Sequence, residues 1–194
     1  MNATAHPPPQ PVAATPTGPV AALLKDPALI AESIANRKRP LGAAAQWLTV
    51  GLVCHGVFGI AVGLFGGWPV AAMDAVKMPL AGFCSLLLCF PSLYVFSCVA
   101  GMPLSILQTL ALGSACLAML GLILVGLAPV AWLFAVSTSS LGFVAMLTFL
   151  LWLVAIGFAG RFVDKLRTAP LFQRQAGLKL WFAILLLVTM QMAT

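Results

Sequence analysis

Long apolar runs, separated by short breaks of proline, glycine or polar residues, dominate the chain after residue 40. The first run, residues 42–67, exceeds the ~20 residues that a helix needs to cross the hydrocarbon core of a bilayer. Residues 78–160 then contain 83 positions without a charged side chain, which is room for three or four further spans. The pattern predicts an all-α protein built as a polytopic transmembrane helical bundle.

Proline, glycine and serine mark the breaks within the uncharged stretch. Residues 101–103 (Gly-Met-Pro) read as a tight turn, and residues 129–140 read as an interfacial segment containing Trp132. The predicted spans are residues 42–67, 78–100, 104–127, 141–160 and 180–192. The fifth span is short, as if trimmed at the C-terminus.

The N-terminal part differs in composition from the bundle. Six of the first nineteen residues are proline, so residues 1–25 are predicted to be a disordered tail. Asp26-Pro27 then resembles a helix start, and residues 26–39 are predicted to form a short helix on the membrane surface or an ordinary linker helix. Residues 40–194 form the predicted transmembrane bundle.

Charge placement supports five spans with a cytoplasmic N-terminus, because Lys and Arg are enriched on the cytoplasmic side. With three spans between residues 77 and 161, only Lys77 falls outside. The residues that fall inside are Lys25, Arg37, Lys38, Arg39, Arg161, Lys165, Arg167, Arg174 and Lys179. These two basic segments are also candidates for contact with lipid headgroups or a partner protein.

Composition excludes a soluble domain, because 62% of the residues are hydrophobic and 7% are charged, against about 25% charged in a typical soluble domain. The net charge of +6 does not indicate nucleic acid, since the basic residues flank apolar spans. The five cysteines lie inside apolar runs without a CxxC pair, so they predict neither a disulfide framework nor a metal centre.

Residues for catalysis are not found in the predicted spans, which contain no Asp, Glu, Lys or Arg. No hydrolase, metalloprotease or phosphate-loop motif occurs, so we predict no catalytic residue, no metal site, no cofactor and no enzyme activity. His55 alone cannot supply two haem ligands or most of a metal shell, and it is interpreted as a structural or interhelical residue.

Two features of the spans suggest contact surfaces. Gly56, Gly59, Gly63 and Gly67 form a stripe of small residues in the first span, which allows close helix packing within the protomer or between subunits. Pro91 is expected to kink the second span, either as simple architecture or as part of a transport site. A polar cavity at that kink would be lined by Ser92, Tyr94, Gln108 and Thr109.

The segments KMPL (residues 77–80) and LCFPSLYVF (residues 88–96) resemble a core shared by a group of bacterial membrane proteins similar to the five-span Yip superfamily. The resemblance implies a cytoplasmic N-terminal tail, five spans and a bacterial inner-membrane location. Yip-like proteins mostly act as membrane organisers and binding partners. Members of the group usually continue beyond the point that corresponds to Thr194.

The leading functional hypothesis is a non-enzymatic membrane subunit or organiser that packs against partner proteins or copies of itself. The glycine stripe and the basic segments would make the contacts, with membrane lipids as further partners. The alternative is a channel or carrier for a small neutral solute, which would use the polar residues near Pro91. A third hypothesis, a cofactor-binding subunit that uses His55, predicts a coloured preparation.

The five-span topology predicts that both basic segments lie on one side of the membrane. Cysteines introduced next to Lys38 and next to Arg167 should therefore react with a membrane-impermeant thiol reagent from the same side. Labelling of the two positions from opposite sides would overturn the topology.

Overall fold

The computed structural model describes residues 40–99, 105–168, 183–184, 187–188 and 191. Its elements are the helices α3 (Pro40–Gly63), α4 (Trp68–Val99), α5 (Ile106–Ser137) and α6 (Leu141–Thr168), with the short 3-10 helix η1 (Leu64–Gly66) between α3 and α4. The described residues form no strand. Backbone groups in lipid must be satisfied within their own segment, and a helix meets this demand.

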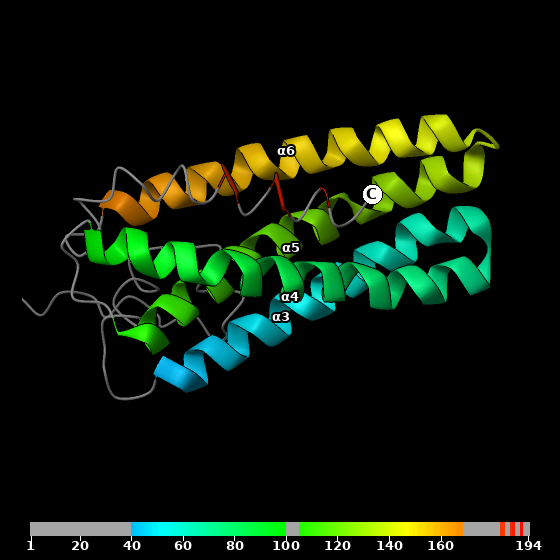
Figure 1. The fold of residues 1–194 in the computed structure, drawn as a ribbon. Coiled ribbons are helices and arrows are strands. Elements are labelled where there is room, and N and C mark those ends of the chain that lie inside the picture. The colour runs from blue at the N-terminus through cyan, green and yellow to red at the C-terminus, as the bar shows by residue number, and fades with distance from the viewer. Residues whose placement is uncertain (1–39, 100–104, 169–182, 185–186, 189–190, 192–194) are drawn as a thin grey trace, which may run out of the picture.

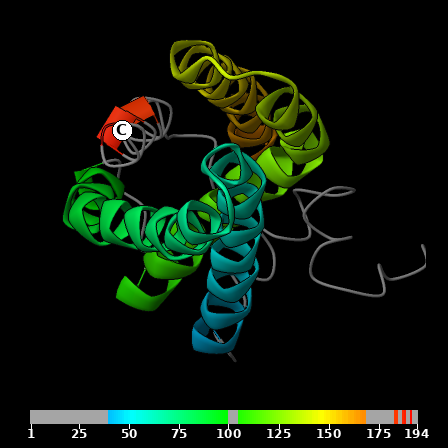
Figure 2. The same ribbon diagram turned by 90° about the vertical axis from the view of Figure 1, so that its right-hand side faces the viewer.

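The four long helices run alternately in opposite directions (Figure 1). The α3–α4 and α5–α6 turns lie at one end of the bundle, called here the hairpin end, while the start of α3 and the end of α6 lie at the other (Figure 1). Helix α5 contacts the other three long helices. Seen from the hairpin end, α4 and α6 lie apart from each other (Figure 2).

Four helices are long and apolar enough to cross a membrane: Leu41–Gly66, Trp68–Val95, Ile106–Ser137 and Leu141–Phe162. This confirms the all-helical prediction and agrees with an integral membrane protein. Three of these helices cover the uncharged stretch between Lys77 and Arg161, but both charged residues lie inside candidate spans and not at their flanks. The predicted tail, the surface helix and most of the fifth span lie outside the described residues, although Val188 packs against the core.

Several helix bounds differ from the sequence prediction. Helix α4 begins at Trp68, ten positions before the expected start of the second span, so Asp74 and Lys77 lie inside a helix rather than in a connector. Pro69 fits the first turn of this helix, where its missing N–H would have no intrahelical partner. Pro79 and Pro91 both lie within α4, since a proline in a membrane helix interrupts a single backbone hydrogen bond that neighbours can offset.

The expected interfacial segment at residues 129–140 is largely helical. Helix α5 passes through Pro129 and ends at Ser137, whose hydroxyl donates to the Leu133 carbonyl at 2.6 Å. The hydroxyl oxygen of Ser140 accepts a hydrogen bond from the Phe143 N–H at 3.4 Å and so caps the start of α6. The polar run therefore forms the tight turn between α5 and α6. Helix α6 continues to Thr168, beyond the predicted end at residue 160.

The glycine stripe of the first span lies against α4. A Cβ at Gly63 would lie 2.6 Å from the Ala71 Cα, and a Cβ at Gly59 would overlap the Asp74 carbonyl oxygen. At Gly56 it would lie 3.3 Å from the Ala75 carbonyl oxygen. Pro79 has no N–H, so the Ala75 carbonyl receives no helical hydrogen bond from it. Because Gly56 has no side chain, helix α3 can pack directly against this carbonyl. Gly67, with a φ of 85°, serves instead in the turn before α4.

A second close approach joins α3 to α5. A Cβ at Gly51 would lie 3.1 Å from the Ala118 backbone nitrogen, and a Cβ at Gly121 would lie 3.0 Å from the Gly51 carbonyl oxygen. Ala111, Ala115 and Ala118 are fully buried on α5. Small residues on both helices thus let the two backbones come together, as in other membrane helix pairs.

Substitution of a packed glycine should destabilise the bundle. We expect Gly59→Ala to lower the free energy of unfolding by about 1–3 kcal/mol, because the added methyl group must displace the α4 backbone. The matched control is Gly157→Ala, where an added Cβ meets no atom within 4 Å. Thermal unfolding in a mild detergent would compare the two variants, and equal melting temperatures would contradict the packing.

Candidate functional site

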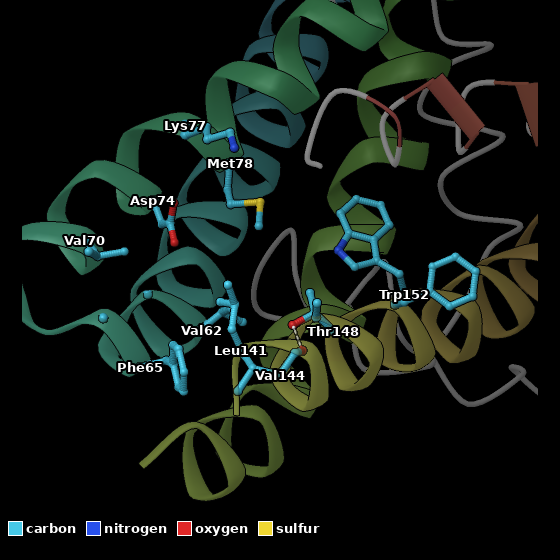
Figure 3. Close-up of a pocket in the computed structure, with 14 residues that line it drawn as sticks. Val62, Phe65, Val70, Asp74, Lys77, Met78, Leu141, Val144, Thr148 and Trp152 are labelled. Atoms are coloured by element: carbon cyan, nitrogen blue, oxygen red, sulfur yellow. Dashed lines mark hydrogen bonds between the residues drawn. The ribbon is translucent and has the colours of Figure 1, made fainter. Parts of the chain in front are cut away.

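A cavity of about 540 Å³ lies between α4 and α6 near the hairpin end. Each of the two helices lines it with one face, because the lining positions are spaced by three or four residues. The lining residues are Val62, Gly63, Phe65 and Gly66 from α3 and η1, Val70, Asp74, Lys77 and Met78 from α4, and Leu141, Val144, Ala145, Thr148, Phe149 and Trp152 from α6 (Figure 3). Val70, Leu141 and Phe149 are also exposed, so the cavity opens onto the outer surface of the bundle.

Asp74 and Lys77 give the cavity its charge. They are the only charged residues between residues 40 and 160, and both lie on the face of α4 that lines the cavity. Asp74 is half-buried and Lys77 is exposed. Within the described part of the chain neither side chain makes an ion pair, although residues three apart on a helix are close enough to interact. Ionisable residues at membrane depth are costly and usually mark a functional site.

Trp152 supplies a polar group on the α6 side. Its side chain is 2% exposed, and its indole nitrogen has no hydrogen-bond partner among the described residues. Figure 3 shows this nitrogen on the edge of the ring that faces α4. Buried polar groups are nearly always satisfied, so the indole N–H is available to a bound molecule. The Thr148 hydroxyl, in contrast, donates to the Val144 carbonyl at 2.8 Å.

His55 lies behind this tryptophan, at the centre of the bundle. The imidazole is 1% exposed, and its Nδ1 lies 2.7 Å from the Gly51 carbonyl oxygen. Gly82 of α4 and Gly121 of α5 leave room for the ring, whose centroid is 6.3 Å from that of Trp152. His55 therefore fills the point where all four helices approach. The described residues include no group of three His, Cys, Asp or Glu side chains that could hold a metal ion.

The polar residues predicted around Pro91 are placed elsewhere and do not line this cavity. The Ser92 hydroxyl donates to the Cys89 carbonyl at 2.7 Å. Gln108 and Thr109 lie in the first turn of α5, where Gln108 forms a capping box with Ser105 and the Thr109 hydroxyl donates to the Ser105 carbonyl at 3.1 Å. Tyr94 is half-buried on α4. The side chains of Ser92, Gln108 and Thr109 therefore hydrogen-bond to the backbone of their own helix or its cap.

The basic residues predicted as lipid or partner contacts are described in part. Arg161 and Lys165 are exposed near the end of α6, and the Arg161 guanidinium lies 5.5 Å from the centroid of the Phe158 ring. Arg167 lies in α6, with its side chain outside the description. The remaining residues, Arg37, Lys38, Arg39 and Arg174, lie outside the described residues.

Sequence reasoning missed the cavity because it assigned Asp74 and Lys77 to a connector. One signal was present: these are the only two charged residues between residues 40 and 160, and they are three positions apart. Had the helix been extended back to Trp68, this spacing would have placed both on one face. The sequence contained no comparable indication that α6 lines the cavity, because Trp152 and Thr148 lie among apolar residues with no charged neighbour.

Comparison of the chain with protein-family models, with curated proteins and with solved structures gave no match. The resemblance to Yip-like proteins therefore stays a prediction.

The cavity should admit a small reagent. In a variant without the five natural cysteines, Thr148→Cys should react with N-ethylmaleimide in detergent, because this side chain lines the opening. Ser114→Cys should stay unmodified, since Ser114 is fully buried on α5. Mass spectrometry of the intact protein would count the adducts, and equal modification of the two variants would argue against an accessible cavity.

Proposed function

We propose that this protein is a non-enzymatic integral membrane protein that binds an amphipathic lipid in the cavity between α4 and α6. The observation that carries the proposal is the combination of apolar walls with the only two charged residues between residues 40 and 160, both lining the same cavity. A cavity of this volume falls in the range of small-molecule sites, which are mostly apolar with a few polar groups that fix orientation.

The cavity favours a lipid over the small neutral solute considered from the sequence. A neutral solute would offer no charged group to the Asp74 carboxylate or the Lys77 ammonium, which make no ion pair in the described residues. A lipid brings charged or strongly polar groups together with a chain that fits between apolar walls. The exposed lining residues Val70, Leu141 and Phe149 give such a chain a lateral entrance from the bilayer.

A role as a membrane subunit or organiser is compatible with lipid binding, and we retain it as part of the proposal. The contact surface, however, is not the glycine stripe, because α4 covers Gly56, Gly59 and Gly63. The exposed basic residues at the end of α6 support contact with lipid headgroups or an acidic partner. Five spans, a cytoplasmic N-terminus and a location in the bacterial inner membrane also belong to the proposal. The antiparallel order of the helices supports one part of this topology, the placement of both basic segments on one side, since it brings residue 40 and the end of α6 to one end of the bundle.

Lipid binding predicts a co-purifying molecule. The wild-type protein, purified in mild detergent, should retain one phospholipid per chain in native mass spectrometry. Ala145→Phe places a phenyl ring in the cavity and should abolish retention by occupying the space. Met146→Phe is the matched control, because Met146 is exposed on the neighbouring position of α6 and does not line the cavity.

Retention that is equal in Ala145→Phe and Met146→Phe would place the lipid on the outer surface and contradict the proposed site. A wild-type protein that retains no lipid would contradict the proposed function itself. Comparison of the melting temperatures of the two variants would show whether Ala145→Phe has instead disturbed the fold.

A further inference from the structure

We propose that the cavity selects a phospholipid whose zwitterionic headgroup carries a primary ammonium and a phosphate, as an ethanolamine headgroup does. This inference rests on the proposed function and specifies its ligand class. Its basis is the arrangement of three groups that line the cavity: the Asp74 carboxylate, the Lys77 ammonium and the Trp152 N–H, which has no partner among the described residues.

Selection must come from polar contacts, because an acyl chain gains little by moving from the bilayer to an apolar protein wall. The two charged residues of the cavity, Asp74 and Lys77, have opposite charges that sum to zero. An anionic headgroup would pair with Lys77 and leave the Asp74 carboxylate unsatisfied, and a cationic amphiphile would leave Lys77 unsatisfied. A zwitterion pairs with both at once, so charge complementarity favours it.

The depths of Asp74, Lys77 and Trp152 below the hairpin end follow the order in which the ammonium, phosphate and ester groups of a phospholipid lie in a leaflet. Helices α4 and α6 both begin at the hairpin end (Figure 1). At a rise of 1.5 Å per residue, Asp74 lies about 9 Å, Lys77 about 14 Å and Trp152 about 17 Å along its helix from that end. A phospholipid in the leaflet at the hairpin end has its ammonium outermost, its phosphate next and its ester groups deepest. The ammonium therefore meets Asp74, the phosphate meets Lys77, and the Trp152 N–H donates to a phosphate or ester oxygen.

The spacing on α4 also suits this headgroup. Side chains three positions apart on a helix have Cβ atoms about 5–6 Å apart, and the headgroup separates its phosphate from its ammonium by a two-carbon linker. A primary ammonium donates hydrogen bonds to a carboxylate. A choline headgroup has no N–H and is recognised by aromatic cages. The lining contains three aromatic residues, Phe65, Phe149 and Trp152, so the expected preference for ethanolamine over choline rests on the hydrogen bonds that a primary ammonium donates to Asp74.

The test is competition between phospholipids that share their acyl chains and differ in headgroup. The full-length protein, delipidated in detergent, is mixed with equal amounts of ethanolamine, choline and glycerol phospholipids, and the bound species are counted by native mass spectrometry. We expect about a tenfold preference for the ethanolamine lipid, the size of effect that one charge-assisted hydrogen bond produces.

Charge variants sharpen the test. Asp74→Asn leaves a net positive site, so the glycerol lipid should now bind at least as well as the ethanolamine lipid. Lys77→Gln should weaken binding of all three lipids, because each carries a phosphate, and should leave the site without preference for the anionic glycerol lipid. The control Met73→Gln changes an exposed residue next to Asp74 that does not line the cavity, and it should keep the wild-type preference. Trp152→Phe keeps an aromatic ring but removes the N–H, and it should weaken binding of all three lipids to a similar extent.

The possible failures are distinguishable. One bound lipid per chain with no headgroup preference, or with preference for the glycerol lipid, would overturn this inference and leave the proposed function standing. Equal binding of choline and ethanolamine lipids would overturn the role of the primary ammonium. A protein that binds none of the three lipids in its cavity would overturn the inference and the proposed function together.

Discussion

Close packing of helix α3 against its neighbours through glycines is the interaction on which the rest of the bundle depends. Gly56, Gly59 and Gly63 bring its backbone against α4, and Gly51 brings it against Gly121 and Ala118 of α5. In lipid, helices gain little from burying apolar surface, so backbone proximity and the resulting van der Waals contact become the main source of association. These contacts fix how α4 is rotated about its axis.

That rotation determines which face of α4 lines the cavity. With Ala71, the Asp74 backbone and Ala75 turned toward α3, the lining face of α4 carries Val70, Lys77 and Met78 together with the Asp74 side chain. Helix α6 packs mainly on α5 and presents its own stripe from Leu141 to Trp152 to the same space. The cavity thus follows from three helices packed tightly at small residues, with the fourth attached chiefly to one of them.

The polar groups in the bundle divide into those that support the fold and those that a ligand could use. Hydroxyls such as Ser92, Thr109 and Thr148 donate to carbonyls in their own helices and are thereby satisfied. His55 fills the central contact through its bond to the Gly51 carbonyl. Asp74, Lys77 and the Trp152 N–H lack such partners in the described residues, and all three line the cavity. Two other buried polar atoms without a partner among the described residues, His55 Nε2 and Ser114 Oγ, do not line the cavity. The cavity is distinguished by the two charged side chains, which no other part of the stretch from residue 40 to residue 160 contains.

The sequence by itself determined that the chain is an all-helical membrane protein, with spans beginning near residues 42, 104 and 141. It could do so because a backbone in lipid must satisfy its own hydrogen bonds, which a helix does, and because a run of ~20 apolar residues matches the thickness of the hydrocarbon core. Only the tertiary structure decided that α4 reaches back to Trp68, that α4 rather than a partner covers the glycine stripe, and that Asp74 faces Trp152 across a cavity. The physical reason is that helices apolar on all sides carry no pattern marking an inner face. Which faces meet is set by contacts between helices that are distant in the sequence.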